Sequence, residues 1–278
     1  MKPAQARVLL TGAAGGIGQA TALALLRAGA SVLLVGRTEH TLAEAARALI
    51  AQGFAASRVK WHRADLTQPH DLQRLVDESA RLGCNVLIHA AGLPAFGALG
   101  QLSAAEMRAV LQTNLEAPML LTQALLPQFM ALPRAQVICV GSALGRMGLP
   151  GFSVYSASKF GLLGFAEALR RELAASPVRV QYLGPRSTRT RFNNAAVSAY
   201  NRSTGTHEDP PEVVADAIVQ MLSSETAERF LGFPEKLAVR LNALAPAWFD
   251  RVFGRHSAHL RDSQIPASTP APLQPPAP

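Results

Sequence analysis

The stretch that decides the fold is Thr11-Gly12-Ala13-Ala14-Gly15-Gly16-Ile17-Gly18, which directly follows the short apolar run Arg7–Leu10. The next run, Ile17–Ala28, is rich in alanine and leucine with helical spacing, and Gly29 follows it as the predicted C-cap. Glycines allow backbone conformations that other residues avoid and let the chain approach a ligand closely. A helix that begins at such a loop offers free N–H groups and a positive dipole end. The stretch therefore predicts a loop that binds the phosphates of a dinucleotide.

The glycine spacing is Gly-xxx-Gly-x-Gly rather than Gly-x-Gly-xx-Gly. A glycine cluster alone is weak evidence, but its place between a strand and a helix makes the signal much stronger. The residues predicted to hold the phosphates are Gly12, Ala14, Gly15, Gly16, Ile17 and Gly18.

Apolar strand-like runs and helical patterns alternate along the rest of the chain. Further strands are expected at Ser31–Val35, Arg58–Ala64, Val86–His89, Gln136–Val140 and Val178–Leu183. Helices are expected at Thr41–Gln52, Pro69–Leu82, Ser103–Leu115, Pro118–Met130, Tyr155–Ala174 and Pro211–Leu222, with a capping box at Ser103 and Glu106. This rhythm predicts an α/β fold, a doubly wound parallel sheet with helices on both faces.

The composition indicates one globular domain with a sizeable core, since 49% of the 278 residues are hydrophobic and 17% are charged. We expect this domain to span residues 1–261. It includes a polar stretch without clear periodicity at 187–209, which is predicted to be a mobile lid, and an apolar segment at 237–253. The Pro-, Ala- and Ser-rich residues 262–278 are expected to be disordered.

Charge and cysteine content narrow the partners and the compartment. The formal net charge is +8, but the arginines are spread without a dense basic block, so nucleic acid is not expected as a partner. The chain has two cysteines, Cys84 and Cys139, in apolar strand-like contexts, which favours a reducing cytosol over a disulfide scaffold. Neither a signal peptide nor a spanning run of ~18 apolar residues is recognised, and no metal ligands are predicted. We expect a cytoplasmic protein.

Two positions after the second and third strands concern the adenosine half of the nucleotide. An acidic residue after the second strand would hold the ribose hydroxyls of NAD, but the sequence there is Val35-Gly36-Arg37-Thr38. Arg37 could pair with a 2′-phosphate, which favours NADP(H) over NAD(H); the alternative is a solvated loop arginine. Asp65 and Leu66 could bracket the adenine, although a turn or N-cap role for Asp65 is an open alternative.

A candidate catalytic set follows the fifth strand. Ser142 lies at the carboxyl end of that strand, where open parallel sheets bind their ligands. Tyr155 and Lys159 are four residues apart on one helical face, a spacing that alone often marks only a solvated face. A nearby ammonium would lower the tyrosine pKa, so that Tyr155 could exchange a proton with a carbonyl or alcohol oxygen while Ser142 donates to the same oxygen.

Taken together, these motifs resemble those of the short-chain dehydrogenase/reductase family, in its compact single-domain branch, from about Arg7 to Leu222. The resemblance is carried by Thr11-Gly12-xxx-Gly16-x-Gly18, Asp65-Leu66, Ala91-Gly92, Asn114, Ser142 and Tyr155-xxx-Lys159. It implies a Rossmann-type sheet of about seven strands and hydride transfer between NAD(P) and a carbonyl/alcohol pair. It also implies that Asn114 holds a water near Lys159, with a helix-bending or capping role as the alternative.

The same resemblance implies further cofactor contacts at Ala90, Ala91 and Gly92 after the fourth strand and at Pro185, Thr188 and Thr190 after the sixth. The chain departs from the family in two places. His89-Ala90 replaces the usual Asn-Asn, so His89 is expected to brace the sheet. Arg186 replaces a glycine, and it could narrow the site or touch an anionic substrate group.

The apolar segment 237–253, which contains Trp248 and Phe249, could lie in a membrane interface or pack on the substrate pocket or a partner subunit. The helices Pro118–Met130 and Tyr155–Ala174 match the family's dimer-forming pair, which implies a homodimer or homotetramer. The sequence therefore predicts an NADP(H)-dependent oxidoreductase for a hydrophobic lipid-, steroid- or 3-oxoacyl-like substrate, with Tyr155 as the acid/base. The alternative is a non-catalytic NADP(H)-binding regulatory or scaffold protein, at most peripheral to a membrane.

Overall fold

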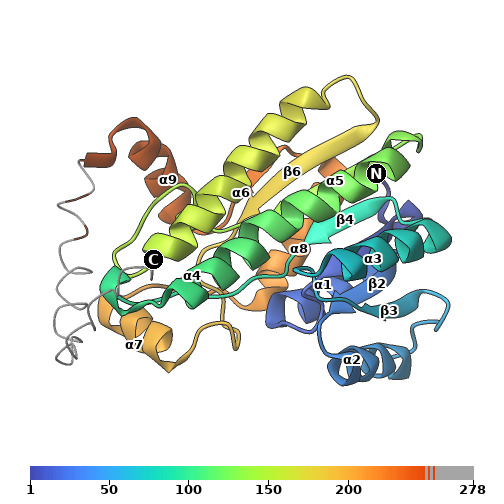
Figure 1. Ribbon diagram of the computed structural model, residues 1–278, viewed down its shortest axis with the longest axis horizontal. Coiled ribbons are helices and arrows are strands. Elements are labelled where there is room, and N and C mark those ends of the chain that lie inside the picture. The colour runs from blue at the N-terminus through green and yellow to red at the C-terminus, as the bar shows by residue number, and fades with distance from the viewer. Residues whose placement is uncertain (248–249, 251–252, 254–278) are drawn as a thin grey trace, which may run out of the picture.

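The computed structural model describes residues 1–247, 250 and 253. Within them, seven parallel strands form one sheet in the order β3-β2-β1-β4-β5-β6-β7 (Figure 1). The strands are β1 (Arg7–Thr11), β2 (Ser31–Gly36), β3 (Val59–Arg63), β4 (Val86–His89), β5 (Ala135–Val140), β6 (Val178–Gly184) and β7 (Glu228–Phe230). The strand order reverses between β1 and β4, and such a switch point opens a crevice at the carboxyl edge. The predicted doubly wound parallel sheet is confirmed.

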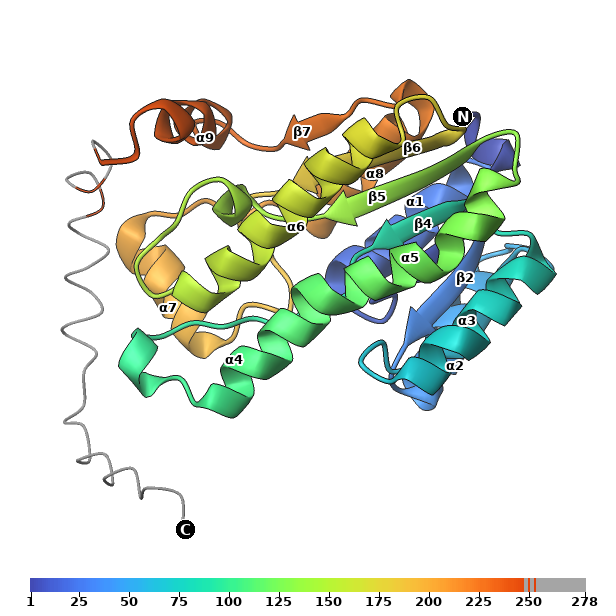
Figure 2. The same ribbon diagram turned by 45° about the horizontal axis from the view of Figure 1, so that its top comes forward.

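Helices cover both faces of this sheet (Figures 1 and 2). They are α1 (Gly16–Arg27), α2 (Glu39–Ala51), α3 (Pro69–Leu82), α4 (Ala104–Leu111), α5 (Ala117–Met130), α6 (Ser153–Glu172), α7 (Ala195–Thr204), α8 (Pro211–Ser224) and α9 (Glu235–Leu244). One core layer joins the sheet to α1, α2 and α8, and the other joins it to α3, α5 and α6.

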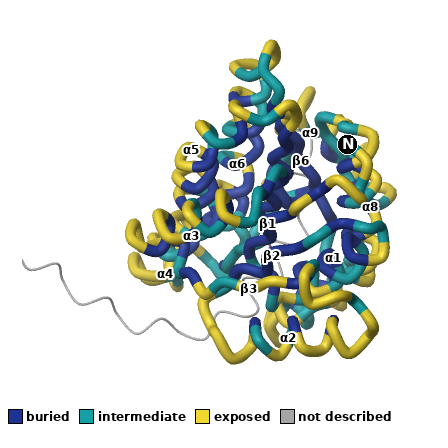
Figure 3. Tube along the Cα trace, turned by 90° about the vertical axis from the view of Figure 1, so that its right-hand side faces the viewer, coloured by how far each residue is buried: buried dark blue, intermediate teal, exposed yellow. Residues whose placement is uncertain are grey.

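The two layers arise from the alternation of side chains along each strand. In β1, Val8 and Leu10 belong to the first layer, while Leu9 belongs to the second. Because both faces are covered, the central strands are mostly apolar and buried along nearly all of their length, and Figure 3 shows them at the centre of the molecule.

The helix pattern predicted for 103–115 and 118–130 is partly corrected. The capping box of Ser103 and Glu106 is present, and α4 begins at it. No break separates the two helices: a π-helical turn, Gln112–Glu116, links α4 to α5. Such wide turns inside helices often occur at functional sites, and this one carries the fully buried Asn114.

The segment 187–209 contains a helix that sequence periodicity did not reveal. Asn194 caps α7 by accepting a hydrogen bond from the Val197 amide at 2.9 Å, and Gly205 ends it with φ +67°. Thr188 and Asp209 form an isolated parallel bridge, so the two ends of the segment are tied together. The segment is mostly polar, so its sequence pattern does not reveal the short helix, and the predicted mobility of this cover stays a prediction.

The C-terminal part of the sequence is only partly described. Strand β7 has three residues and no apolar run, which is why it was not located from the sequence. Helix α9 occupies the first half of the segment 237–253, whereas Trp248, Phe249 and the predicted disordered stretch 262–278 lie outside the described residues. Among the described helices, none combines the length and apolar character needed to cross a bilayer.

Candidate active site

A large cavity lies at the carboxyl edge of the sheet. It has a volume of about 1220 Å³ and lies between the phosphate loop, the ends of the strands and the segment 187–209. Every predicted catalytic and cofactor residue except Asn114 lines it. These residues are Gly12, Ala14, Gly15, Gly16, Ile17, Gly18, Arg37, Asp65, Leu66, Ala90, Ala91, Gly92, Ser142, Tyr155, Lys159, Pro185, Thr188 and Thr190.

The glycine loop is shaped for close backbone approach. Gly12 has φ +66°, and a Cβ atom there would stand 2.7 Å from the backbone of Ala90 and Ala91. A Cβ atom on Gly18 would collide with the Gly12 carbonyl oxygen. Helix α1 then begins at Gly16 without a side-chain cap, so its first amides face the cavity edge. This cradle fits a pyrophosphate, as the sequence predicted.

Thr11 and His89 brace the backbone beneath that cradle. The Thr11 hydroxyl accepts hydrogen bonds from the amides of Ala90 (3.1 Å) and Ala91 (3.2 Å). The buried His89 ring lies 2.8 Å from the Thr122 hydroxyl on α5, and burial lowers the His89 pKa to about 3, with a smaller contribution from Lys159. His89 is thus a neutral structural residue that joins β4 to α5, in agreement with the expected bracing role.

The adenosine side of the cavity holds Arg37 and Asp65. Arg37 is exposed at the end of β2 and lines the cavity together with Thr38. The Asp65 carboxylate accepts hydrogen bonds from the amide (3.0 Å) and hydroxyl (2.8 Å) of Thr67. Asp65 therefore closes its own turn, the alternative that the sequence left open, while it also borders the cavity.

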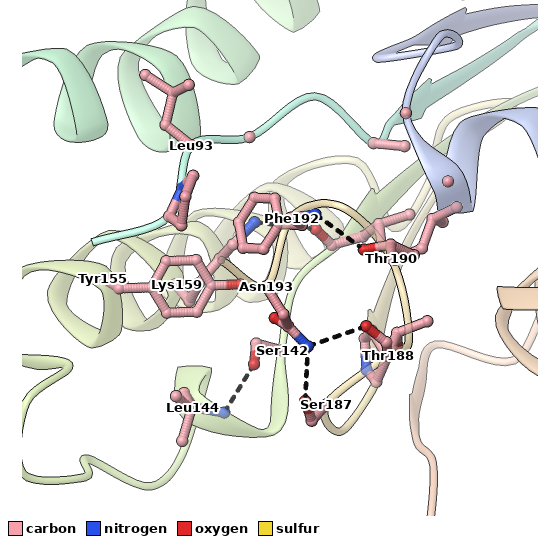
Figure 4. A pocket seen from close by; sticks show the side chains of 18 of the residues that line it. Leu93, Ser142, Leu144, Tyr155, Lys159, Ser187, Thr188, Thr190, Phe192 and Asn193 are labelled. Carbon is pink, nitrogen blue, oxygen red and sulfur yellow. Dashed lines mark hydrogen bonds between the residues drawn. The ribbon is translucent and has the colours of Figure 1, made fainter. Parts of the chain in front are cut away.

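The residues Ser142, Tyr155 and Lys159 meet where β5 ends and α6 begins, as Figure 4 shows. Lys159 is buried, and its Nζ donates to the Val140 carbonyl at 3.2 Å and lies 5.7 Å from the centre of the Tyr155 ring. Ser142 accepts a hydrogen bond from the Leu144 amide at 3.1 Å. The sequence motif thus becomes one cluster of two hydroxyls and an amine.

The pKa values of this cluster differ from the sequence expectation. Burial raises the pKa of Tyr155 to about 12, partly offset by a hydrogen bond with Ser142. Burial also lowers the pKa of Lys159 to about 8. The expected lowering of the Tyr155 pKa is therefore not what the protein groups alone produce, because burial of the phenol disfavours the charged phenolate more than the hydrogen bond with Ser142 favours it.

Asn114 holds the loop after β4 against α6. Its Oδ1 accepts from the Leu93 amide at 2.7 Å, and its Nδ2 donates to the Leu93 carbonyl (3.0 Å) and the Ser158 hydroxyl (3.1 Å). The side chain is fully engaged with protein groups and does not line the cavity. The Asn114 side chain thus clamps the loop after β4 to α6, and its role in holding a water near Lys159 stays a prediction.

The segment 187–209 reaches over the phosphate loop. The Thr190 methyl group packs where a Cβ atom on Gly16 would stand, which brings this segment onto the start of α1. Asn193 donates to the Ser187 hydroxyl and to the Thr188 carbonyl, both at 3.1 Å (Figure 4). Thr188 and Thr190 are therefore held at the cavity wall, as the family resemblance implied.

Arg186 stands where the family has glycine, and its guanidinium forms ion pairs with two carboxylates of the protein. Its guanidinium donates to both Asp209 oxygens at 2.9 and 2.7 Å, and it lies 3.3 Å from Glu235 of α9. The arginine and Asp209 side chains are only 14% and 9% exposed. With two carboxylates against it, Arg186 is not the receptor for an anionic substrate group that the sequence left open; it joins the segment 187–209 to α9.

Sequence reasoning missed the aromatic wall beside Tyr155. Phe152, Phe192 and Tyr200 line the cavity, and ring centres lie 6.4 Å apart for Phe152 and Tyr155 and 6.0 Å apart for Tyr155 and Phe192. These rings come from the N-cap residue of α6 and from the segment 187–209, so no single motif contains them. Only the isolated aromatic residues in an otherwise polar stretch could have drawn attention to them.

Comparisons with known proteins agree with this geometry. The sequence model described as "short chain dehydrogenase" matches residues 6–201. The ketoacyl reductase HetN of Nostoc is 30% identical over 88% of this chain and 87% of its own. The dehydrogenase/reductase SDR family member 7B of Bos taurus is 31% identical over 92% of this chain and 83% of its own.

Solved structures show the same arrangement. A short-chain dehydrogenase from Streptomyces avermitilis has a TM-score of 0.76 at 26% identity, covering 89% of this chain and 97% of its own. One from Sphingobium yanoikuyae, in complex with NADPH, has a TM-score of 0.75 at 27% identity, covering 94% and 98%. The chain therefore belongs to the short-chain dehydrogenase family and is an oxidoreductase that acts on an alcohol/carbonyl pair with a nicotinamide nucleotide.

Proposed function

We propose that the protein is an NADP(H)-dependent reductase of a hydrophobic ketone or aldehyde, with Tyr155 as the group that gives the proton. The observation that carries this proposal is the meeting of Ser142, Tyr155 and Lys159 beside an aromatic wall, in the same cavity as the glycine cradle. The nucleotide supplies the hydride when bound. Side chains of the protein are proposed to donate the proton and to orient the substrate.

Tyr155 and Ser142 are proposed to hold the carbonyl oxygen of the substrate. Because the pKa of Tyr155 is raised to about 12, its phenol keeps its proton at neutral pH and can donate it to that oxygen. The Ser142 hydroxyl donates to the same oxygen and sets its direction. The buried Lys159 ammonium is proposed to hold the ribose hydroxyls and to stabilise the phenolate that remains.

Hydrophobic walls support an apolar substrate. The rings of Phe152 and Phe192 lie beside Tyr155, and the same cavity is also lined by Met147, Leu149 and Val197. Aromatic and aliphatic side chains with few convergent polar groups are typical of pockets for apolar ligands. A lipid-, steroid- or 3-oxoacyl-like substrate fits this lining, and the similarity to the ketoacyl reductase of Nostoc supports the last of these.

The alternative of a non-catalytic scaffold rested on the changes at His89-Ala90 and Arg186. Neither change leaves the site incomplete, because Thr122 and Thr11 brace the loop after β4 and Asp209 neutralises Arg186. These contacts support catalysis, and the substrate panel described next tests the scaffold alternative.

Substitution of Tyr155 tests the proposed chemistry. Tyr155→Phe should lower kcat for NADPH-driven reduction by roughly 10²–10⁴-fold, since the proton donor is lost while the ring stays. NADPH oxidation over a panel of ketones, aldehydes, long-chain 3-oxo compounds and steroids would measure the loss. Tyr200→Phe, which removes a hydroxyl from the same cavity, is the matched control. Unchanged turnover in Tyr155→Phe would refute the assignment.

Arg37 supports the preference for NADP(H) by its position at the cavity edge, where a guanidinium can pair with a 2′-phosphate. Arg37→Glu should raise KM for NADPH about 10–100-fold, because a charge-assisted contact is replaced by repulsion, and should leave KM for NADH little changed. Steady-state kinetics with both nucleotides would show this. Equal effects on NADPH and NADH would contradict the preference.

We also propose a homodimer or homotetramer and a cytoplasmic site of action. The outer sides of α4, α5 and α6 expose Leu111, Leu120 and Phe160, which suits burial against another subunit. Cys84 and Cys139 are buried and unpaired, as is usual in a reducing compartment.

Val239 of α9 packs on Met147, so this part of 237–253 covers the pocket; membrane contact stays a prediction that vesicle flotation would test.

A further inference from the structure

A single buried phenol holds both backbone groups of Ser142. The Tyr182 hydroxyl accepts a hydrogen bond from the Ser142 amide at 3.1 Å and donates one to the Ser142 carbonyl at 3.0 Å. Tyr182 lies in β6 beside Cys139 of β5, so its ring runs along the sheet toward the point where β5 ends. The side chain is fully buried and does not line the cavity.

Two glycines make room for this hydroxyl. A Cβ atom on Gly141 would overlap the Tyr182 ring and hydroxyl, and one on Gly145 would overlap the hydroxyl. Neither glycine has a positive φ, so the backbone conformation at these positions does not itself require glycine. At Gly141, Tyr182 occupies the space that a side chain would need. At Gly145, Tyr182 does so together with the Lys159 carbonyl oxygen, which lies 2.8 Å from the position of a Cβ atom.

The phenol is itself rigidly held. Its ring packs on Phe230 with 5.8 Å between centres and belongs to the core layer that includes Leu162 and Ala166 of α6. Burial raises the Tyr182 pKa, so the hydroxyl keeps the proton that it donates to Ser142. The contact therefore links β5, β6 and the turn before α6 through one atom.

With its amide and carbonyl both fixed, Ser142 retains only the rotation of its side chain. Its Oγ is limited further by the hydrogen bond from the Leu144 amide. We infer that Tyr182 is a positioning residue for the reaction. It keeps the Ser142 hydroxyl at the correct place relative to the Tyr155 hydroxyl and does not itself contact substrate or nucleotide. This inference rests on the proposed function in one respect, namely that Ser142 orients the substrate oxygen.

Tyr182→Phe tests the inference because it removes the hydroxyl and keeps the ring. We expect kcat for the best carbonyl substrate of the panel to fall about tenfold, since small displacements of a catalytic group are costly. KM for NADPH should stay unchanged. Tyr182→Leu also lacks the hydroxyl, and it should show a loss at least as large, which keeps the test valid if one variant folds poorly.

Gln181→Met is the matched control for a merely structural loss. Gln181 is the preceding residue of β6, is equally buried, and donates to the carbonyls of Met221 (2.9 Å) and Thr226 (3.0 Å) on the side of α8. Its loss should lower the melting temperature and leave kcat within twofold of the unmodified protein. A kcat loss in Gln181→Met equal to that in Tyr182→Phe would show that strand stability, not positioning, is responsible, and would overturn the inference.

A double-mutant cycle with Ser142→Ala decides whether Tyr182 acts through Ser142. If it does, Tyr182→Phe should lower kcat about tenfold in the unmodified protein and less than twofold in the Ser142→Ala background. Equal losses in both backgrounds, or no loss in either, would overturn the inference while leaving the proposed function intact. Full activity of Ser142→Ala would instead overturn the role proposed for Ser142, and with it the role of Tyr182.

Discussion

At the scale of single residues, burial sets the chemistry of the site. Lys159 and Tyr155 are one helical turn apart, and burial favours the neutral form of both side chains. It lowers the pKa of Lys159 to about 8 and raises the pKa of Tyr155 to about 12. The phenol is thus a proton donor throughout the neutral range, and the amine changes charge just above it. The residue pair therefore favours carbonyl reduction near neutral pH.

These pKa values predict the pH dependence of both directions. Below about pH 8 Lys159 carries its charge and Tyr155 its proton, so kcat/KM for reduction should be highest there and fall as pH rises through 8. Alcohol oxidation, which needs the phenolate, should increase over the same range. Initial rates from pH 6 to 10 would show opposite slopes.

Lys159→Arg provides the control for that profile. Arginine keeps its charge at all these pH values, so the decline of the reductive rate near pH 8 should disappear in the variant, even if its absolute rate is lower. A decline that persists unchanged in Lys159→Arg would assign the titration to another group.

At the scale of elements, ion pairs join the two ends of the segment 187–209 to each other and to α9. Arg186, which precedes the segment, pairs with Asp209 at its end and with Glu235 at the start of α9. The Glu208 carboxylate accepts from Asn193 (2.8 Å) and Asn201 (2.7 Å) inside the segment. The placement of the segment 187–209 over the cavity thus depends on a few polar contacts that are nearly buried.

Arg186→Ala should loosen this cover. The variant leaves Asp209 nearly buried without its partner, and loss of one member of a buried pair costs roughly 3–5 kcal/mol. We expect faster proteolytic cleavage within 187–209 and a several-fold higher KM for the carbonyl substrate. Limited proteolysis followed by mass spectrometry would measure the first and steady-state kinetics the second.

Arg81→Ala is a suitable control, since Arg81 forms an exposed ion pair with Glu78 on α3, far along the chain from the cover. Such exposed pairs contribute little to the free energy of unfolding, because water and salt screen the two charges. If Arg186→Ala resembled Arg81→Ala in both measurements, the proposed link between the ion pair and the cover would be wrong.

At the scale of the whole molecule, most buried apolar residues belong to two layers, and one outer face also carries exposed apolar residues. The layers on either side of the sheet hold the apolar residues of the strands and of six helices. Helices α4 and α5 follow each other in one continuous helix, and α6 runs beside it (Figures 1 and 2). The outer surface of these helices keeps Leu111, Leu120 and Phe160 exposed. This face is the surface on which we expect subunits to associate.

Phe160→Glu should therefore convert the protein to a smaller species. Burial of a charge in an apolar interface is costly, so the subunits should separate while each stays folded. Size-exclusion chromatography with light scattering would give the mass. Ile50→Glu, at a comparably exposed apolar residue on α2, should leave the mass unchanged. A monomeric unmodified protein would contradict the expected association.

The sequence by itself determined the fold class and the order of the central elements. The glycine loop is a local motif whose geometry depends on neighbours in the chain, and the strands of a sheet covered on both faces are apolar runs that can be read directly. Likewise, Ser142, Tyr155 and Lys159 could be assigned because strand ends and helix turns place residues by short-range spacing.

The tertiary structure alone decided the features that join distant segments. It placed Phe192 and Tyr200 of the segment 187–209 at the cavity wall, paired Arg186 with Asp209, and put the Tyr182 hydroxyl against the backbone of Ser142, forty residues away. It also reversed the expected direction of the Tyr155 pKa shift, because desolvation depends on everything that surrounds the ring. Local spacing carries no information about such contacts, since they arise only when separate elements pack.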